Sequence, residues 1–496
     1  MRNLRFFLLL TLAMGGVAGC TVGPDYKRPT VDVPVDWRLP EHEARQLADT
    51  DWWRQFNDPV LDQLIATALQ ENKDLLIAAA RIEEFAGRYG IVRADFFPQV
   101  GASADYTRQR VTETGENALV PGYKVTTNSF SAALNAGWEI DLWGRIRRST
   151  EAARAQLIAS EEGRRAVVLT LVSNVAGAYI NLRDLDRQLE ISRNTARSRG
   201  ESYALFQERF NGGIVSDLEL SQNRSQYQEA LASIPPLEKA IAQQENSLCV
   251  LLGRNPGPIA RGKTIDELIL PVVAAGIPSD LLERRPDIRQ AEQNLIAANA
   301  QIGVAKAAYF PTISLTGALG TASGELSDLF KGPSRIWQYS VPVSMPIFTA
   351  GKIAGSVREA EALQQQALLG YQQAIQNGFR EVNDALVAQQ QTDKQLETQK
   401  SQVAALRQYA DIARLRYDNG YTDFLTVLDA ERSLFSAELS YAQTQGELHL
   451  ARIALYKAVG GGWVDKADAL SQPLPAETAA GQAKTEKNRA DERTKK

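Results

Sequence analysis

Residues 209–218 read RFNGGIVSDL, and residues 416–425 read RYDNGYTDFL. Each stretch places a glycine where a long helical pattern stops, followed by a polar residue that can cap the next helix. In the first stretch, Ser216 is followed three residues later by Glu219, which is the spacing of a capping box. The two stretches therefore predict two helical hairpins, each of which reverses within a few residues.

The two stretches belong to an internal repeat, which indicates two copies of one structural unit. We expect these copies at residues 60–253 and 281–463, joined by a linker over 254–280. Other short motifs also occur twice. Some pairs are 207 residues apart, as 209 and 416 are, and others are 213 residues apart. At 207 they are DLWGRI (141–146) with FTAGKI (348–353) and LLGRN (251–255) with AVGGG (458–462); at 213 they are Asp74 with Asp287 and ADFFPQ (94–99) with AAYFPT (307–312).

Each copy is predicted to contain one very long helix. Residues 145–210 and 352–417 lack proline and predict helices of roughly 66 residues, each about 100 Å long. With their return helices, the predicted helical hairpins cover 145–252 and 352–459. Helices this long and this polar are typical of the wall of a coiled-coil tube rather than of a globular core.

Two further helical features are expected. Residues 60–95 predict a stretch of about 36 residues, so that it and a return helix together match the long helix in length. Pro235-Pro236 predicts an interruption of the first return helix, because proline lacks an N–H group and its ring clashes with the preceding turn.

Each copy also contains a pattern with a period of two residues, which predicts β-hairpins at about 98–143 and 311–349. Strands of about ten residues with aromatic residues near their ends are typical of sheets with lipid on one face and water on the other. A half-buried sheet of a soluble protein is the alternative. The alternating apolar positions include Val100, Ala102, Ala104, Tyr106, Phe130, Ala132, Leu134, Ala136, Trp138, Ile313, Leu315, Trp337, Tyr339, Val341, Val343, Met345 and Ile347.

Four strands are too few to close a barrel, and an open sheet edge is not tolerated in lipid. We therefore expect several copies of the chain to pool their strands, and three copies would supply twelve. Beyond the N-terminal residues, no run of 18 or more apolar residues occurs, so we expect no transmembrane helix.

Composition excludes several classes of function. The chain has 496 residues and a net charge of −4, which gives no general attraction for nucleic acid. With two cysteines and two histidines, a disulfide framework or a His/Cys metal cluster is not expected. No pattern of catalytic residues stands out. We expect no enzymatic activity, no bound metal and no cofactor other than a covalent lipid.

The N-terminus predicts export and lipid attachment. Residues 1–19 begin with basic residues and continue with a short apolar stretch, as in a signal peptide. Val17-Ala18-Gly19 precede Cys20, as small residues do in a bacterial lipobox, so Cys20 is the predicted lipidation site. An ordinary signal peptide with an incidental cysteine is the alternative. Residues 20–59 would then form a lipid-anchored segment.

The chain resembles the outer membrane factors, the TolC-like and OprM-like exit ducts of Gram-negative efflux systems, and in particular their NodT-type lipoprotein branch. The resemblance covers residues 20–465. The stretches that carry it are CTVGPDYKRP (20–29), WW (52–53), FNDP (56–59), RRPDI (284–288), DFLTVLDAER (423–432) and GGGW (460–463).

This resemblance implies an α+β membrane protein. It implies a homotrimer in which a 12-stranded transmembrane β-barrel, with four strands from each chain, continues into a long periplasmic α-helical barrel. It also implies a passive duct in the outer membrane. A periplasmic adaptor protein and an inner-membrane pump of the resistance-nodulation-division class would deliver substrate, and the adaptor would open the closed periplasmic tip.

The resemblance also implies roles for individual residues. Asp429 and Tyr417 match gate positions at the tip, and Asp423 could add charge, although capping a helix is its simpler role. The first copy has Gln222 and Phe210 in the places of Asp429 and Tyr417. The adaptor is expected to dock on the turns Gly212, Gly213, Ile214, Val215, Ser216, Gly420, Tyr421 and Thr422, and the residues expected to face the barrel lumen are Asp105, Glu139 and Asp141.

One motif points elsewhere. GPIARGKT (257–264) matches the P-loop pattern of nucleotide-binding proteins. Pro258 removes an N–H group that a phosphate cradle would use, and Pro271 ends the following segment before a helix can form. No counterpart of the motif occurs in the second copy. We therefore predict a linker and no nucleotide binding.

Three functional alternatives remain from the sequence. The preferred one is the passive outer-membrane exit duct of a tripartite efflux system, with its substrates left open. A channel for metal-cation efflux or for type I secretion is the second, and a lipid-anchored periplasmic coiled-coil scaffold is the third. Residues 464–496 are expected to form a polar C-terminal tail.

Overall fold

The computed structural model describes residues 21–31, 33–34, 51–112, 114, 125–270, 280–460 and 463–470. The predicted signal peptide at 1–19, the predicted lipidation site Cys20 and residues 471–496 of the predicted tail lie outside the described residues. The chain divides into two compact units. Unit 1 comprises residues 1–30, 81–160 and 290–371, and unit 2 comprises 31–80, 161–289 and 372–496.

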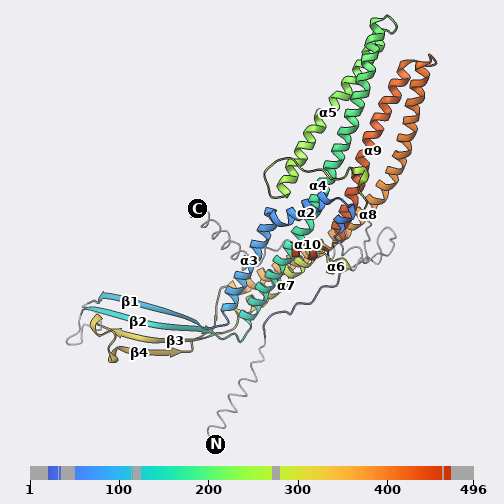
Figure 1. Ribbon diagram of the computed structural model, residues 1–496. Helices are drawn as coiled ribbons and strands as arrows, with labels where there is room; N and C mark the ends of the chain where they lie inside the picture. Colours follow the sequence, from blue (N-terminus) through green and yellow to red (C-terminus); the bar gives the residue numbers. More distant parts are fainter. Residues whose placement is uncertain are drawn as a thin grey trace, which may run out of the picture. The chain divides into compact units, whose positions relative to one another are not determined.

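Unit 1 contains an antiparallel sheet with the strand order β1-β2-β3-β4 (Figure 1). The alternation of apolar and polar residues predicts these strands because successive side chains of a strand point to opposite faces. β2 pairs with β3, so the hairpins of the two repeats join into one sheet. The strands are β1 (Gln99–Arg110), β2 (Thr126–Glu139), β3 (Thr312–Ser323), β4 (Arg335–Ser340) and the short β5 (Val343–Ser344).

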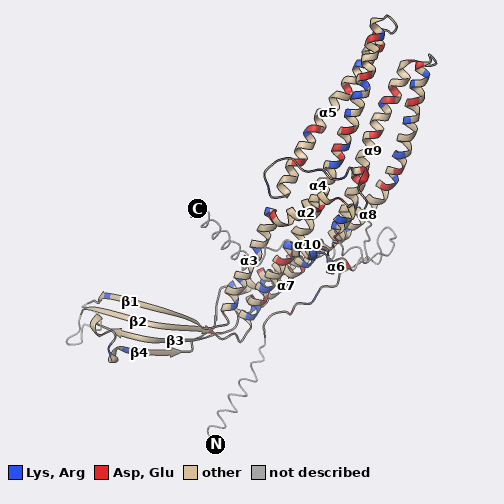
Figure 2. Ribbon diagram, in the orientation of Figure 1, with Lys and Arg blue, Asp and Glu red and all other residues tan. Residues whose placement is uncertain are grey.

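The two faces of this sheet differ in chemistry. In the observed register, Tyr106 lies opposite Phe130, and Leu134 lies between Ala102 and Leu319. Trp337 lies opposite Leu319 on the same face. Apart from Ile336, the other face carries small and polar residues, which include Gln99, Gly101, Ser103, Asp105, Ser129, Ser131, Ala133, Asn135, Ser314, Thr316, Ala318, Gly320, Gln338 and Ser340. Charged residues are sparse on the strands (Figure 2).

The fourth strand is shorter than the alternation at 337–347 predicts. β4 ends at Ser340, β5 covers only Val343 and Ser344, and the strand pattern does not extend to Met345 and Ile347. Both pieces keep the same register on β3, and the carbonyl of Pro342 accepts a hydrogen bond from Ser314 N at 3.1 Å. Proline cannot donate in return, which explains the gap in the ladder.

The residues after Cys20 run along unit 1 as an extended strap, residues 21–30. Val22 N donates to Trp143 O, and Arg148 binds Asp25. Further on, Arg28 forms a bidentate ion pair with Glu292 at 2.6 Å, and Tyr26 also donates to Glu292. The strap is therefore fixed to α4 (Arg145–Asn211) and α7 (Pro286–Ala307) by side-chain contacts.

Two helical hairpins dominate unit 2, although their long helices begin in unit 1, which includes residues up to 160 and 371. The first is α4 with α5 (Asp217–Leu251), and the second is α8 (Lys352–Asp418) with α9 (Phe424–Val459). α4 and α8 each contain 67 residues and end within one residue of the predicted positions. Charged residues occur along all four helices (Figure 2).

The predicted interruption at Pro235-Pro236 is wrong, because α5 continues through both prolines. The two missing N–H groups remove only two of the hydrogen bonds along a helix of 35 residues. α5 is also fixed to its neighbours on both sides of the pair. Ala230 before it and Ile241 after it are buried.

The predicted stretch at 60–95 is two helices, α2 (Pro59–Glu71) and α3 (Lys73–Ala94). Asn72 between them is buried, its Oδ1 accepts from Leu75 N, and its Nδ2 donates to Leu251 O. The matching segment of the second repeat is α6 (Leu281–Arg284) followed by α7.

The main core of unit 2 is formed by α2, the central part of α4 and the ends of α5 and α9. Trp52 stacks on Tyr456 with a centroid distance of 5.0 Å and meets Trp463 edge-on. Trp463 begins α10 (Trp463–Leu470), whose Val464 and Ala467 are buried. The predicted polar tail from 464 is therefore wrong for 464–470, because these apolar residues share the face of a helix that packs on the core.

One helix in the described part of the chain, α4, contains an 18-residue window apolar enough to cross a membrane by length and composition. Because 56% of that window is buried within the protein, core packing accounts for its composition. Val172, Val175, Ala176 and Ile180 of α4 belong to the main core.

Candidate functional site

Both helical hairpins end in the same backbone motif. Ile214 N donates to Arg209 O and Gly213 N to Phe210 O, and the same pattern recurs from Tyr421 N to Arg416 O and from Gly420 N to Tyr417 O. These are the two bonds of a Schellman motif, which requires a left-handed residue after the helix. Gly213 and Gly420 supply it, with φ of +72° and +74°.

Each return helix begins at a side-chain cap. Ser216 and Glu219 form the predicted capping box, with Ser216 Oγ accepting from Glu219 N at 3.2 Å. Asp423 caps α9 by accepting hydrogen bonds from the backbone N and the hydroxyl of Thr426. These bonds hold the pKa of the Asp423 carboxyl below its usual value. Asp423 therefore has the structural role that its position in the sequence also predicts.

An aromatic cluster links the two hairpins immediately behind the turns. Phe206 of α4 lies 4.5 Å from Phe424 of α9, measured between ring centroids. Tyr417 stacks on Phe206 at 6.1 Å and also contacts Phe424 at 5.1 Å. Burial raises the pKa of the Tyr417 hydroxyl. Phe206 and Phe424 belong to a small hydrophobic core at the ends of the hairpins, which we call the tip core, and in a single copy of the chain the ring of Tyr417 packs against it.

Asp429 lies on the first part of α9 and borders a cavity of about 200 Å³ between α5 and α9. Its carboxylate pairs with Arg432 at 3.2 Å, and both side chains are more than half exposed. Gln222, which has the position of Asp429 in the first repeat, lines the same cavity. The structure thus brings the two equivalent positions to one groove.

The sequence reasoning did not identify Arg432. Its spacing of three residues from Asp429 on a helix is a signal that could have revealed the ion pair. The pairing matters because it offsets the negative charge of Asp429 within each copy.

The turns expose apolar side chains at equivalent positions of the repeats. Ile214 is 75% exposed and Tyr421 is 74% exposed. Leu218 and Leu425, also equivalent, are exposed as well. Val215 differs, because it packs against the tip core. The predicted docking turns therefore present apolar groups on both hairpins.

The predicted lumen residues lie on or next to the polar face of the sheet. Asp105 lies opposite Ser131 in the β1–β2 ladder. Glu139 forms a bidentate ion pair with Arg145 at 2.9 Å. Asp141 accepts from the backbone N–H groups of Ile146 and Arg147, and so holds the first turn of α4. Two of the three carboxylates thus have structural partners where the sheet meets α4.

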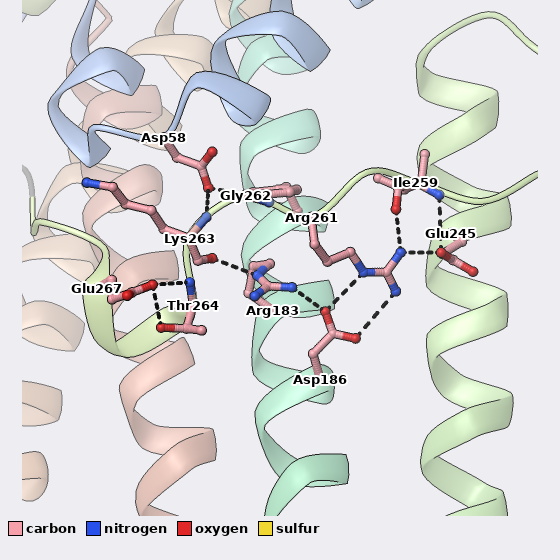
Figure 3. Close-up of polar contacts among 11 residues, drawn as sticks. Asp58, Arg183, Asp186, Glu245, Ile259, Arg261, Gly262, Lys263, Thr264 and Glu267 are labelled. Carbon is pink, nitrogen blue, oxygen red and sulfur yellow. Dashed lines mark hydrogen bonds and ion pairs between the residues drawn. The ribbon is translucent and has the colours of Figure 1, made fainter.

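The P-loop-like motif forms part of the linker between the repeats, on unit 2 (Figure 3). Lys263 N donates to Asp58 Oδ2 and Gly262 N to the hydroxyl of Tyr179, which in turn donates to Asp58. A side chain at Gly262 would collide with the Asp58 carboxylate. The N–H groups of Ile259, Gly262, Lys263 and Thr264 are engaged by the protein, and the Asp58 carboxylate lies where the last glycine and the lysine of the motif would meet an anion.

Arginine side chains fix the rest of the linker. Arg261 pairs with Asp186 of α4 and with Glu245 of α5, and Arg183 donates to Lys263 O at 2.8 Å (Figure 3). The segment that follows, Ile265–Glu267, is a single 3-10 turn and not the helix that a P-loop precedes. These contacts agree with the prediction of a structural linker.

The fold and the site define a class of proteins in which two repeats combine an amphipathic sheet with long helical hairpins. The chain belongs to the outer membrane efflux protein family, whose model matches residues 64–254 and 277–461. It is accordingly an efflux channel of the outer membrane.

Individual relatives agree with this family. The chain is 37% identical over 487 residues to the probable efflux pump outer membrane protein TtgC of Pseudomonas putida, covering 95% of this chain and 99% of the relative. It is 37% identical over 457 residues to the cation efflux system protein CusC of Escherichia coli, covering 90% and 97%. The solved CmeC outer membrane channel of Campylobacter jejuni superposes with a TM-score of 0.85 at 26% identity, covering 92% of this chain and all of that one.

Proposed function

We propose that three copies of the chain assemble into a passive exit duct whose sheets close into a 12-stranded barrel in the outer membrane. The observation that carries this proposal is the sheet of unit 1. Its apolar face is exposed at Val100, Leu134, Leu319, Trp337 and Tyr339.

The edges of the sheet require partners. Within the described residues, β1 pairs only with β2, and β4 pairs only with β3. In lipid an unpaired edge leaves N–H and C=O groups without hydrogen bonds, which costs several kcal/mol for each group. Pairing β1 of one copy with β4 of the next removes both edges. It also turns the small and polar face, including Asp105, toward a lumen.

The gate of this duct is proposed at the tips of the helical hairpins. Three copies would bring three Asp429 carboxylates together, and rings of carboxylates select or bind cations in channels. Arg432 moderates this charge because it pairs with Asp429 in each copy. Tyr417 joins the gate through its contacts with Phe206 and Phe424, and Asp423 contributes by holding the start of α9.

The partners follow from the same proposal. A periplasmic adaptor would dock on the turns 212–216 and 420–422, where Ile214 and Tyr421 are exposed. An inner-membrane pump would supply substrate. Cys20 would carry a covalent lipid, and the strap that follows it would hold that lipid near Trp143, to which Val22 is hydrogen-bonded.

Two substrate classes follow from the relatives. TtgC is described as a component of an efflux pump, and CusC as a component of a cation efflux system, and both are 37% identical to this chain. Deleting the gene and measuring sensitivity to organic solvents, to antibiotics and to copper or silver salts would separate the two classes.

The duct is tested by native mass spectrometry and by single-channel recording in planar bilayers. We expect trimers that conduct and that are blocked by multivalent cations from the side of the helical tips. Asp429→Ala should remove the block and Arg432→Gln should strengthen it. Asp384→Ala, which removes an exposed carboxylate of α8 far from the turn in sequence, is the control. Monomers without conductance would overturn the duct, and an unchanged block in Asp429→Ala would overturn the gate.

A further inference from the structure

A cavity of about 500 Å³ lies within unit 2 between the two helical hairpins. It is lined by α4 of the first hairpin and by α8 and α9 of the second. The lining residues lie within 187–195, 400–407 and 438–445. None of them belongs to the turns, to the gate or to the sheet.

The floor of the cavity is apolar. Ile191 of α4, Val403 of α8 and Ala442 of α9 are each at least 90% buried and come from the three different helices. Asn194, Lys400, Ala404 and Arg407 also line the cavity and are exposed, so the cavity is open to solvent. An apolar group bound there would displace water from Ala404 and from the part of the floor that remains exposed.

The rim of the cavity is polar, with more cations than anions. Arg187 is already engaged by Glu190 and Asp266, which lie outside the lining. Arg407 uses one nitrogen to bind Glu438, and an arginine has five N–H donors. Within the described residues, no ion pair involves Lys400. Lys400 and the remaining donors of Arg407, both on α8, can therefore bind an anionic group.

The dimensions of the cavity favour a small molecule over a protein segment. The lining residues span 187–195 on α4, 400–407 on α8 and 438–445 on α9. Each span is about two helical turns, or about 12 Å. A cavity of this length and volume is within the range of small-molecule sites. It is too short to hold a docked helix of several turns.

We propose that this cavity binds an amphipathic organic anion, with its carboxylate or sulfonate at Lys400 and Arg407 and its ring system on Ile191, Val403 and Ala442. A molecule there contacts both hairpins and stabilises their packing against each other. This binding is independent of whether the chain conducts, so the two proposals can fail separately.

The test uses the full-length protein in a non-ionic detergent and three matched probes: 2-naphthalenesulfonate, the neutral 2-naphthalenemethanol and the cationic 2-naphthylmethylammonium. Binding is measured by titration calorimetry against detergent alone. The sulfonate should bind most tightly and should raise the thermal unfolding midpoint, because a ligand that prefers the folded state stabilises it.

Three variants locate the site. Lys400→Gln should weaken sulfonate binding about tenfold, since a charge-assisted hydrogen bond is lost, and should leave the neutral probe unaffected. Ala404→Trp fills the cavity and should abolish binding of both probes. Lys394→Gln removes another exposed lysine of α8 that is not part of the lining and should change nothing.

Two results would overturn the proposal. One is equal affinity for the three probes, which would indicate hydrophobic partition without a site. The other is unchanged sulfonate binding in Lys400→Gln, which keeps the test decisive even where Ala404→Trp disturbs folding. Conductance recorded on the same preparations shows whether the duct itself is intact.

Discussion

Asn72 and Arg285 occupy equivalent positions in the two repeats, 213 residues apart, and each holds an equivalent carbonyl group. Asn72 Nδ2 donates to Leu251 O at 2.8 Å, and Arg285 Nη1 donates to Ala458 O at 2.8 Å. Both residues are buried and lie directly before a helix, α3 or α7. Different side chains thus perform the same task, which is to fasten the end of each return helix to the start of the helix, α3 or α7, that precedes the hairpin of the same repeat.

This relationship predicts the cost of removing either side chain. Arg285→Met should destabilise the protein by about 2–3 kcal/mol, because Ala458 O loses its buried donor, while Asp287 and Glu381, each more than a third exposed, are partly solvated in its place. Asn72→Ala should cost about 1–3 kcal/mol, since it also removes the bond to Leu75 N. Thermal unfolding in detergent measures both effects.

The control is Arg380→Met. Arg380 also contacts Glu381, but at 3.9 Å and with its side chain 62% exposed, so less than about 1 kcal/mol is expected. Equal losses for Arg380→Met and Arg285→Met would contradict a special role for the buried residue.

The turn glycines predict opposite effects for two adjacent positions. Gly213→Ala places a side chain at a left-handed backbone position and should destabilise the first tip by about 1 kcal/mol. Gly212→Ala should be neutral or slightly stabilising, because its φ is not positive and a Cβ there would be at least 3.6 Å from its neighbours. Hydrogen exchange of the Ile214 amide, which is bonded to Arg209 O, would report the difference. Faster exchange in both variants would contradict the backbone explanation.

The contacts of the linker predict that Asp58, which lies outside the P-loop-like motif, contributes more to the stability of the fold than Lys263 within the motif. Asp58→Ala should cost about 3 kcal/mol or more, because Val60 N, Lys263 N and the Tyr179 hydroxyl all lose a buried acceptor. Lys263→Ala should cost less than about 1 kcal/mol, since the contacts of this loop use its backbone. A nucleotide-binding loop would show the reverse, with ATP binding lost in Lys263→Ala. Chemical unfolding and calorimetry with ATP check both expectations.

The burial of Asp184 predicts that the protein becomes more stable when the negative charge of this side chain is removed. Burial against Gly446 raises the pKa of its carboxyl to about 6, despite a hydrogen bond from Gln188, and Glu447 adds repulsion. Because the folded-state pKa is above the unfolded value, ionised Asp184 destabilises the fold above about pH 6, and this cost disappears as pH falls toward about 4. Asp184→Asn should therefore stabilise by up to about 3 kcal/mol at pH 8 and by little at pH 4. A gain that does not depend on pH would point to packing instead.

His449 predicts a pH dependence of the opposite sign. It packs beside Phe56, and burial, assisted by repulsion from Arg452, lowers its pKa to about 4. Below about pH 6.5 the unfolded chain takes up a proton that the folded chain does not, so stability falls as pH drops toward about 4. His449→Leu should remove this fall. Asp184 contributes with the opposite sign over the same range, so unfolding midpoints between pH 8 and pH 4 are compared between Asp184→Asn, where the fall should be visible, and the double variant with His449→Leu, where it should be absent.

The elements were predictable where the pattern is local and repeated. The glycine stop signals set the ends of α4 and α8 to within one residue, and the alternation of apolar residues located β1 to β4. The alternation at 337–347 predicts one continuous strand and takes no account of Pro342, whose missing N–H explains the gap between β4 and β5. The break at Asn72 has a local part, because Asn72 Oδ1 accepts from Leu75 N three positions on, and a part that only the fold reveals, because Nδ2 donates to Leu251 O, 179 positions away.

The candidate site was predictable only in part, for the same reason. The caps at Ser216 and Asp423 depend on residues three positions away and were foreseen. The stacking of Tyr417 on Phe206 joins two hairpins that are 211 residues apart in sequence, so only the fold reveals it. The repeat in the sequence shows that Gln222 and Asp429 are equivalent positions. That the two side chains line the same cavity is seen only in the structure.

The linker contacts also give the duplicated chain a direction. Tyr179 and Arg183, which hold the linker, lie on α4, and the equivalent positions of α8 are Leu386 and Gln390, which offer neither the phenol nor the guanidinium. If the two repeats were identical, α8 would also carry a tyrosine and an arginine at these positions. Those two side chains would have no linker to hold, because the linker joins the first repeat to the second. Exchanging the order of the repeats would leave the linker without its partners, so the two copies are no longer interchangeable parts.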